Sequence, residues 1–216
     1  MTKNNSHIII FGAGGHAKSV ISIIEAESKW QIHGLYVDCG SKRKNDSILG
    51  YEIIDNETQL QKANITRAFV AIGDNHVRAK ITNKIMREGI SLIHTVHPLA
   101  IVMTDFAIGS GTMIHAQAIL GADCRVGSNV IISAMVCVAH DSYIGEYAHL
   151  APGVLIGGGA TIGDYSFLGM GATVLPNVTI GTNVQVGANS VVLKDLEDNV
   201  VVVGNPARVI KRNIHS

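Results

Sequence analysis

The pair His140-Asp141 is the part of this 216-residue sequence best suited to proton transfer. Histidine exchanges a proton readily near neutral pH, and a neighbouring carboxylate can orient the imidazole and stabilise its charged form. A reaction in which an amine or a hydroxyl attacks an electrophile needs such a base for the released proton. The sequence therefore favours His140 as a general base with Asp141 as its partner, and a surface histidine at a corner, without a chemical role, is the alternative.

A second candidate site is the glycine-rich loop Gly12-Ala13-Gly14-Gly15-His16-Ala17-Lys18. At a strand-to-helix turn, glycines let backbone N–H groups approach a phosphate at the N-terminus of the helix. Asp38 lies about where such folds place the acidic residue that binds ribose hydroxyls. A nucleotide-sugar pyrophosphate or a dinucleotide fits this pattern. The alternative is a tight turn that packs helix on strand and binds no ligand.

Apolar runs predict the elements that position this loop. We expect strands at His7–Phe11, Ile32–Val37 and Ala68–Ile72, each followed by polar or glycine-rich residues. Helical patterns run from the glycine loop to about Ser28, and from the Gly73-Asp74-Asn75 turn to about Glu88. The alternation of strand and helix indicates a small parallel sheet with crossover helices, a Rossmann-like arrangement.

A six-residue repeat organises the second half of the chain. Every sixth residue from Val102 to Val192 is aliphatic, sixteen positions without a slip in register. Three six-residue segments make one triangular coil, so the repeat predicts a parallel β-helix of about 5.3 coils, each about 4.8 Å high. Glycines recur every eighteen residues, which we interpret as a corner that needs a permissive backbone. These glycines are Gly109, Gly127, Gly145, Gly163 and Gly181.

Composition excludes several classes of protein. The 17 Lys+Arg balance the 17 Asp+Glu, which argues against a nucleic-acid binder. No apolar run is long enough to span a bilayer, and Met1–Ser6 is too polar for a signal peptide, so we expect a cytoplasmic protein. Three cysteines at unrelated spacings argue against a disulfide framework or a zinc cluster.

Charge locates a domain boundary. Residues 1–98 hold 12 Lys/Arg and 9 Asp/Glu, whereas residues 101–216 hold only 5 and 8. The dipeptide His97-Pro98 lies at the transition, and proline biases its predecessor towards extended backbone. We therefore predict two domains, residues 1–97 and residues 98–216, the second with a C-terminal tail.

The combination of motifs resembles the sugar acetyltransferases of the hexapeptide-repeat superfamily. The resemblance rests on the glycine loop, the Ala71–Asn75 turn, the repeat Val102–Val192 and the closing segment Gly204–Arg208, and it spans nearly the whole chain. It is greatest to the UDP-4-amino-sugar N-acetyltransferases of the bacillosamine pathway, with GDP-perosamine N-acetyltransferases close behind. It implies a nucleotide-sugar-binding domain at residues 1–97 and a left-handed β-helix acetyltransferase domain with a C-terminal tail at residues 98–216. It also implies acetyl-CoA as cosubstrate and a homotrimer with active sites between subunits.

The resemblance also implies a role for each matching residue. His140 is the general base, and Asp141 stands where the resembling enzymes often have Glu. The implied contacts are His149, Gly158, Met170 and Ala188 for acetyl-CoA, and Gly14, Gly15, His16, Asp38 and Gly73 for the nucleotide sugar. Arg208 and Lys211 could meet the CoA phosphates, and a solvated tail explains them equally well. The alternative for His149 is a structural role, in which its side chain finds a hydrogen-bond partner at a trimer interface.

The expected reaction is N-acetylation of the 4-amino group of UDP-4-amino-4,6-dideoxy-N-acetylglucosamine, giving UDP-N,N'-diacetylbacillosamine. A GDP-perosamine N-acetyltransferase and a sialic acid O-acetyltransferase are the alternatives within the superfamily. Outside it stand a zinc carbonic anhydrase-like lyase and a non-catalytic nucleotide-binding scaffold. We expect no metal, because the repeat lacks the closely spaced histidine ligands of such a lyase, and we expect Cys124 and Cys137 to pack in the core.

Overall fold

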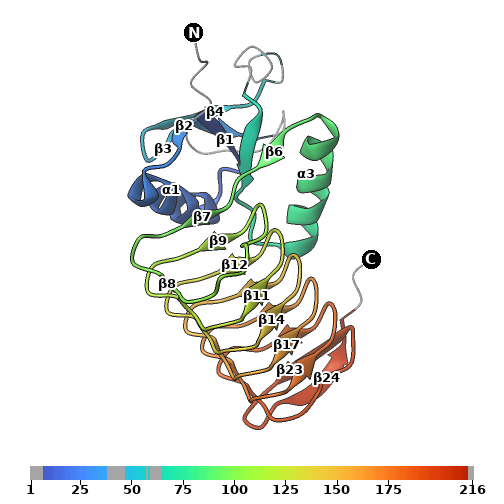
Figure 1. Ribbon diagram of the computed structural model, residues 1–216. Coiled ribbons are helices and arrows are strands. Elements are labelled where there is room, and N and C mark those ends of the chain that lie inside the picture. The colour runs from blue at the N-terminus through green and yellow to red at the C-terminus, as the bar shows by residue number, and fades with distance from the viewer. Residues whose placement is uncertain (1–6, 38–46, 57, 59–64, 214–216) are drawn as a thin grey trace. The chain divides into compact units, whose positions relative to one another are not determined.

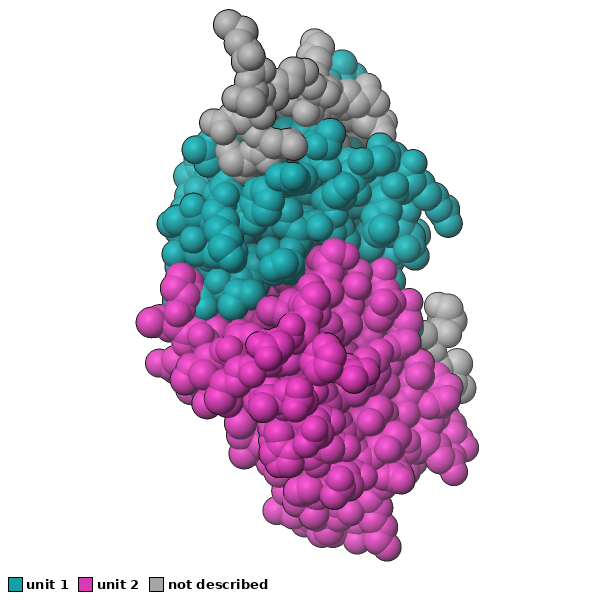
Figure 2. All heavy atoms as spheres, in the orientation of Figure 1, with its two compact units in different colours: residues 1–97 teal, residues 98–216 magenta. Residues whose placement is uncertain are grey.

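The chain divides into two compact units, Met1–His97 and Pro98–Ser216, which Figures 1 and 2 show in ribbon and space-filling form. The structure is a computed structural model that describes residues 7–37, 47–56, 58 and 65–213. Asp38, a candidate ribose-binding residue, lies outside the described residues. Each unit has its own sheet system and is described separately below.

The first unit is built on a six-stranded sheet in the order β3-β4-β2-β1-β5-β6. All neighbouring strands are parallel except β3, which runs antiparallel to β4. The strands are β1 (His7–Phe11), β2 (Gln31–Tyr36), β3 (Ser47–Ile48), β4 (Tyr51–Ile54), β5 (Arg67–Val70) and β6 (Ser91–Leu92). The three predicted strands are present within two residues at each end, and β3, β4 and β6 extend the sheet on both sides.

Two helices follow the sheet strands, as the sequence pattern predicts. The helix α1 (Gly15–Glu27) buries its apolar stripe, with Val20, Ile21 and Ile24 fully inaccessible to solvent. It ends at Ser28, which adopts the left-handed conformation common at helix C-termini. The helix α3 (Asn75–Arg87) follows β5 and packs against β5 and β6. Both helices therefore begin directly after a parallel strand, at the carboxyl edge of the sheet.

The second unit is a parallel β-helix whose strands are only two residues long, apart from those at its end (Figure 1). One sheet has the order β22-β19-β16-β13-β10-β8, and a second has the order β11-β14-β17-β20. The third contains β9, β12, β15, β18, β21, β23 and β24. The strands of the first sheet are β8 (Ile101–Val102), β10 (Ile119–Leu120), β13 (Cys137–Val138), β16 (Leu155–Ile156), β19 (Thr173–Val174) and β22 (Val191–Val192). Those of the second are β11 (Arg125–Val126), β14 (Tyr143–Ile144), β17 (Thr161–Ile162) and β20 (Thr179–Ile180). Those of the third are β9 (Met113–Ile114), β12 (Ile131–Ile132), β15 (His149–Leu150), β18 (Phe167–Leu168), β21 (Gln185–Val186), β23 (Val200–Val203) and β24 (Arg208–Arg212).

The predicted repeat register is the register of the structure. Residues eighteen apart are paired across coils, as in Leu120 with Val138 and Val138 with Ile156. The fourteen repeat positions from Ile114 to Val192 are no more than 7% exposed, because each side chain points into the prism. Val102 and Ile108 are less buried because they belong to the first coil. The predicted fold class, a small α/β sheet followed by a β-helix of hexapeptide repeats, is confirmed.

The column of glycines has a different cause from the one expected. None of these five glycines has a positive φ, so they do not supply a permissive backbone. A Cβ at Gly145 would lie 2.7 Å from the backbone nitrogen of Asp164, and one at Gly127 would lie 3.0 Å from that of Glu146. Glycine is therefore required by the close approach of successive coils. The left-handed position falls two residues later, and it is occupied by Gly111, Asn129, Tyr147, Tyr165 and Asn183.

Candidate active site

His140 and Asp141 lie together in the turn between β13 and β14. The imidazole Nδ1 is 2.7 Å from Asp141 Oδ2, and the two side chains are 69% and 64% exposed. Asp141 has a φ of +59° and donates its backbone N–H to the Ala122 carbonyl one coil away. Aspartate is among the few residues other than glycine that tolerate this conformation well. The pair thus has the geometry of an oriented imidazole, with Nε2 left for a substrate.

Gly158 lies directly beneath the imidazole. A Cβ at this position would be 2.7 Å from both His140 Cε1 and Nε2. The sequence predicts that small neighbours leave room for a substrate, and at Gly158 that room is filled by the imidazole itself. Within the described part of the chain, the Gly158 N–H donates no hydrogen bond. The structure therefore leaves a backbone donor next to the candidate base.

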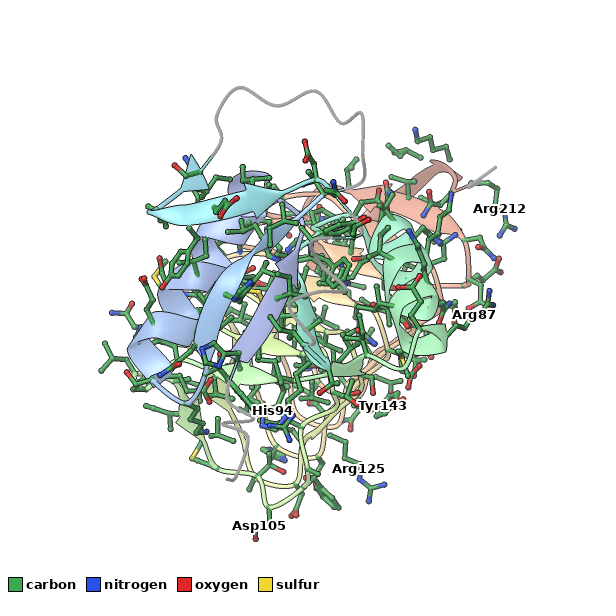
Figure 3. All side chains as sticks on the ribbon, turned by 90° about the horizontal axis from the view of Figure 1, so that it is seen from above. Arg87, His94, Asp105, Arg125, Tyr143 and Arg212 are labelled. Atoms are coloured by element: carbon green, nitrogen blue, oxygen red, sulfur yellow. The ribbon has the colours of Figure 1, made fainter. Side chains whose placement is uncertain are left out.

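A hollow of about 470 Å³ lies beside this pair. The guanidinium of Arg125 stacks on the Phe106 ring, with 4.4 Å between its Cζ and the ring centroid, on one side of the hollow. Figure 3 shows Arg125 projecting outward from the ribbon of the β-helix. The lining residues are Phe106, Asp123, Arg125, Asp141, Ser142 and Tyr143. The hollow therefore gives a mixed aromatic and charged surface immediately next to Asp141.

Three of the four predicted acetyl-CoA residues, His149, Met170 and Ala188, lie on other parts of the prism. His149 is in β15, on a different sheet from β13 and β14. Its ring meets the Phe167 ring edge-on, with 5.1 Å between the two ring centroids. Met170 is 61% exposed at the turn between β18 and β19, and Ala188 occupies the same position one coil further on. One chain thus brings His140, Asp141 and Gly158 together at one corner of the prism, while Met170 and Ala188 lie at another.

The glycine loop forms an open helix N-terminus in the first unit. Gly14 is the N-cap of α1 and provides no side chain to accept a hydrogen bond from the first turn. Among the described residues, a Cβ on Gly14 or Gly15 would meet no atom within 4 Å, so both positions border open space. His16, the second residue of the helix, is half-buried. An anion is favoured at such an end by the backbone N–H groups and the helix dipole.

The turn after β5 lies beside the glycine loop. Strand β1 is flanked by β2 and β5, which makes its carboxyl end the switch point where ligands of such sheets bind. The N–H of Ala71 donates to Phe11 O at 2.8 Å, and a Cβ on Gly12 would come within 2.9 Å of Ala71 O. A Cβ on Gly73 would meet nothing within 4 Å. The structure therefore brings the glycine loop and Gly73 to one edge of the sheet.

Arg78 in α3 belongs to this edge, and sequence reasoning assigned it no role. Its side chain is 1% exposed and donates hydrogen bonds to the carbonyl oxygens of Ile72 and Gly73. The available signal was its position four residues after the Asp74 N-cap. Helical side chains lean towards the N-terminus, so a long side chain at this position can reach the turn.

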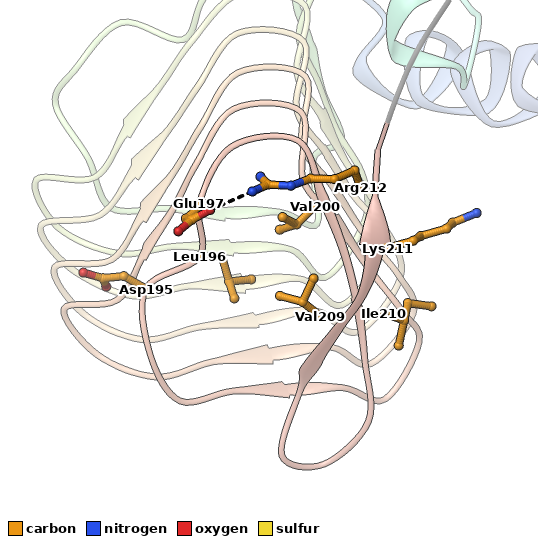
Figure 4. A pocket seen from close by; sticks show the side chains of 8 residues that line it. All are labelled: Asp195, Leu196, Glu197, Val200, Val209, Ile210, Lys211 and Arg212. Carbon is orange, nitrogen blue, oxygen red and sulfur yellow. Dashed lines mark hydrogen bonds and ion pairs between the residues drawn. The ribbon is translucent and has the colours of Figure 1, made fainter.

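The C-terminal residues form a separate hollow at the end of the β-helix, also of about 470 Å³ (Figure 4). Strand β24 runs antiparallel to β23, and Arg212 reaches Glu197 Oε2 at 3.3 Å. Lys211 points away from the apolar floor of this hollow in Figure 4, and Arg208 donates to Ala207 O at 2.8 Å. This hollow does not include His140 or its neighbours.

Two free cysteines, Cys124 and Cys137, lie in the described part of the β-helix. Cys124 is fully buried, and that burial, together with the Asp123 charge, raises the pKa of its thiol to about 11. Cys137 is half-buried in β13. Within the described ranges, no three His, Cys, Asp or Glu side chains gather as a metal site would require. None of the described helices is both long and apolar enough to cross a bilayer.

Comparison with known proteins finds relatives of both units of the chain. Residues 7–85 match the PglD N-terminal domain family, and residues 123–158 and 159–194 match the bacterial transferase hexapeptide family of six repeats. PerB from Caulobacter crescentus, solved in complex with CoA and GDP-perosamine, is 34% identical with a TM-score of 0.86. The likeness covers 95% of this chain and 97% of PerB.

Two further relatives agree with this result. The acetyltransferase domain of PglB from Neisseria gonorrhoeae FA1090, solved with acetyl coenzyme A, is 29% identical with a TM-score of 0.86, covering 96% of this chain and 100% of that domain. A GDP-perosamine N-acetyltransferase from Escherichia coli O157:H7 is 29% identical over 108 residues, 49% of each chain. The match thus spans about half the length of this curated relative.

The chain belongs to the PglD-like family of hexapeptide-repeat sugar N-acetyltransferases. The family expected from the sequence, its enzyme class and its use of acetyl-CoA are confirmed at this level. The acceptor sugar, the roles of the individual residues and the assembly of the subunits are taken up below as proposals.

Proposed function

We propose that this protein transfers the acetyl group of acetyl-CoA to the amino group of GDP-perosamine. The observation that carries the proposal is the His140-Asp141 pair, at 2.7 Å, on a hexapeptide prism that follows a switch-point nucleotide fold. GDP-perosamine takes precedence over the UDP-4-amino sugar because PerB is 34% identical, against 29% for the PglB domain. The UDP-4-amino-4,6-dideoxy-N-acetylglucosamine favoured by the sequence analysis is the second candidate.

The chemistry follows from the positions of three groups. The sugar amine attacks the acetyl carbonyl carbon, forming the C–N bond, while His140 Nε2 accepts the proton that the nitrogen loses. Asp141 holds Nδ1 and stabilises the imidazolium. The Gly158 N–H donates to the carbonyl oxygen as it gains negative charge. The C–S bond then breaks, and the CoA thiolate leaves and takes the proton from His140.

The nucleotide part of the acceptor is proposed to bind the first unit. The free N-terminus of α1 at Gly14 and Gly15 suits the diphosphate, and His16 and Gly73 flank the same edge. Asp38 stays a proposed ribose contact from its place in the sequence. This assignment uses two features that favour anions, namely orphan backbone N–H groups and an aligned helix dipole.

The complete active site is proposed to form in a homotrimer. His140 and Gly158 lie at one corner of the prism, whereas Met170 and Ala188 lie at another. If all four meet one acetyl-CoA molecule, the two corners come from neighbouring chains. His149 lies on the third sheet, which borders the corner of Met170 and Ala188. The exposed Met135, Leu155 and Met170 supply apolar surface for such an interface.

The test is release of free thiol from acetyl-CoA with a panel of acceptors: GDP-perosamine, the UDP-4-amino sugar, CMP-sialic acid and free sialic acid. Turnover with GDP-perosamine at least tenfold above the others supports the proposal. Turnover with the UDP sugar alone keeps the chemistry and replaces the nucleotide. Turnover only with sialic acid moves the reaction to a hydroxyl and contradicts the proposed amine acceptor.

The variant His140→Ala separates catalysis from binding. Since general-base catalysis contributes about 10²–10⁴-fold, we expect kcat to fall by at least about 100-fold. The dissociation constants for CoA and for GDP, measured by calorimetry, should stay within about twofold of wild type, because the side chain is 69% exposed and its partner Asp141 is 64% exposed. Unchanged turnover would exclude His140 as the base.

A further inference from the structure

We propose that Arg78 is a positioning residue for nucleotide binding, and that it acts by fixing the direction of the peptide groups in the Ile72–Asn75 turn. This inference rests on the proposed function, because it assumes that the nucleotide sugar binds at this edge of the sheet. Arg78 is an unusual side chain for that place, since arginine is seldom fully buried and this one is 1% exposed.

The contacts of Arg78 are concentrated on the turn. Its Nη1 donates to Ile72 O at 3.0 Å and to Gly73 O at 3.2 Å, and its Nη2 donates to Asn75 Oδ1 at 2.9 Å. Hydrogen bonds from a charged donor are stronger than neutral ones. The Asp74 side chain holds the other end of the turn by accepting from the Val77 N–H at 2.8 Å. The guanidinium thus fixes the part of the turn that the N-cap does not reach.

The direction of the carbonyl groups determines the direction of the N–H groups. In a trans peptide the C=O and the following N–H point opposite ways. Because Gly73 O accepts from Arg78, the Asp74 N–H in the same peptide group is directed away from the guanidinium. Among the described residues, a Cβ on Gly73 would meet no atom within 4 Å. The turn therefore directs the Asp74 N–H away from Arg78 at the N-terminus of α3.

This donor suits the diphosphate of a nucleotide. The N-terminus of α3 follows β5, next to the N-terminus of α1 that follows β1, at the switch point of the sheet. Two helix dipoles and the buried positive charge of Arg78 act on the same edge. Without the guanidinium, the Gly73 carbonyl loses its hydrogen bond to Arg78 and can rotate, which turns its oxygen towards the anion and the Asp74 N–H away from it.

The experiment compares Arg78→Met, Arg78→Lys and the matched control Arg87→Met. Arg87 lies in the same helix but is exposed at its far end (Figure 3). Calorimetry with GDP and UDP gives the dissociation constants, and steady-state kinetics gives KM for each substrate. We expect Arg78→Met to weaken nucleotide binding and raise the KM for the nucleotide sugar at least tenfold. The KM for acetyl-CoA and kcat at saturation should change less than twofold. Arg78→Lys should recover part of the affinity, and Arg87→Met should match wild type.

Three outcomes would overturn the inference: unchanged nucleotide affinity in folded Arg78→Met, an equal loss in Arg87→Met, or a loss confined to kcat. If Arg78→Met does not fold, as judged by circular dichroism, Arg78→Lys and Asn75→Ala decide instead, since each removes part of the contacts. A wild-type protein that binds neither GDP nor UDP would overturn the assumption about the site itself. A wild type that binds nucleotide but acetylates no sugar would contradict the proposed reaction and leave Arg78 testable by calorimetry.

Discussion

The position of the His140 imidazole depends on the absence of a side chain at residue 158, one coil away. Gly158 has no side chain, and the ring occupies the volume that a Cβ would take, at 2.7 Å from Cε1 and Nε2. A Cβ cannot approach these atoms so closely, and His140 is the more mobile partner because it is largely exposed. The glycine at 158 therefore determines where the candidate base can lie.

The variant Gly158→Ala tests this dependence. The added methyl group should displace the imidazole from its position above residue 158, and we expect kcat to fall by about tenfold or more. The melting temperature should change by only about 2 °C, because the exposed ring can rotate away and Gly158 has no positive φ. Both quantities are measured on the same preparation.

Gly157→Ala is the matched control. Its Cβ would lie 2.7 Å from Pro176 Cδ and 2.8 Å from the Leu175 carbonyl carbon, within the wall of the prism. We therefore expect overpacking that destabilises the β-helix by about 1–3 kcal/mol. If Gly158→Ala also lost stability while retaining its kcat, residue 158 would be structural and the interpretation of the site would be wrong.

At the scale of the elements, the hexapeptide repeat was the most predictable feature. A side chain that points into a narrow prism must be aliphatic, so the register of the coils is written directly into every sixth residue. The column of five glycines is visible in the sequence, but the cause predicted for it, a permissive backbone at a corner, is wrong. Sequence alone cannot separate a positive φ from a close approach of two backbones, because both exclude a Cβ.

Other parts of the site left no comparable pattern. The strands β3, β4 and β6 have two to four residues, which is too short for an alternation to show. The burial of Arg78 could not be predicted from the sequence, although its partners Ile72, Gly73 and Asn75 lie only three to six residues before it. The His140-Asp141 pair was predictable because both partners are adjacent in the sequence.

The end of the β-helix illustrates how an element is fixed by a few polar side chains. Asn213 follows β24, is 9% exposed, and donates its side-chain N–H to Asn183 O at 2.8 Å. Its backbone N–H donates to Asn199 O at 2.7 Å, and Asn183 Nδ2 donates to Asn199 Oδ1 at 2.8 Å. These buried hydrogen bonds join the final strand to the last coil.

We expect Asn213→Ala to lower the free energy of unfolding of the β-helix by about 1–3 kcal/mol, because it removes the amide that donates to Asn183 O and Oδ1 in a buried place. The neighbouring Arg212→Ala removes exposed contacts to Glu197 at 3.3 Å and to Asp198 O at 3.4 Å, and should cost about 0–1 kcal/mol. Denaturant titrations followed by circular dichroism measure both. Equal effects would mean that the asparagine contacts do not stabilise this end.

At the scale of the whole molecule, the position of the predicted residues argues for shared sites. His140 and Ala188 lie at different corners of one prism, each between a different pair of sheets. A closed ring of three chains can bring such corners together, because each interface of a three-membered ring joins two different surface patches. The proposed homotrimer therefore predicts that each active site takes residues from two chains.

Mixing two inactive variants tests that prediction. His140→Ala removes the base, and Ala188→Trp fills the proposed acetyl-CoA path at a position that is exposed in the single chain. Each variant alone should have little activity. In trimers assembled from equal amounts of both chains, each corner is intact with a probability of one half, so activity should return to about a quarter of wild type. Two affinity tags confirm that mixed trimers have formed. Mixed trimers without activity would place all the catalytic groups in one chain, and sedimentation as a monomer would contradict the shared site directly.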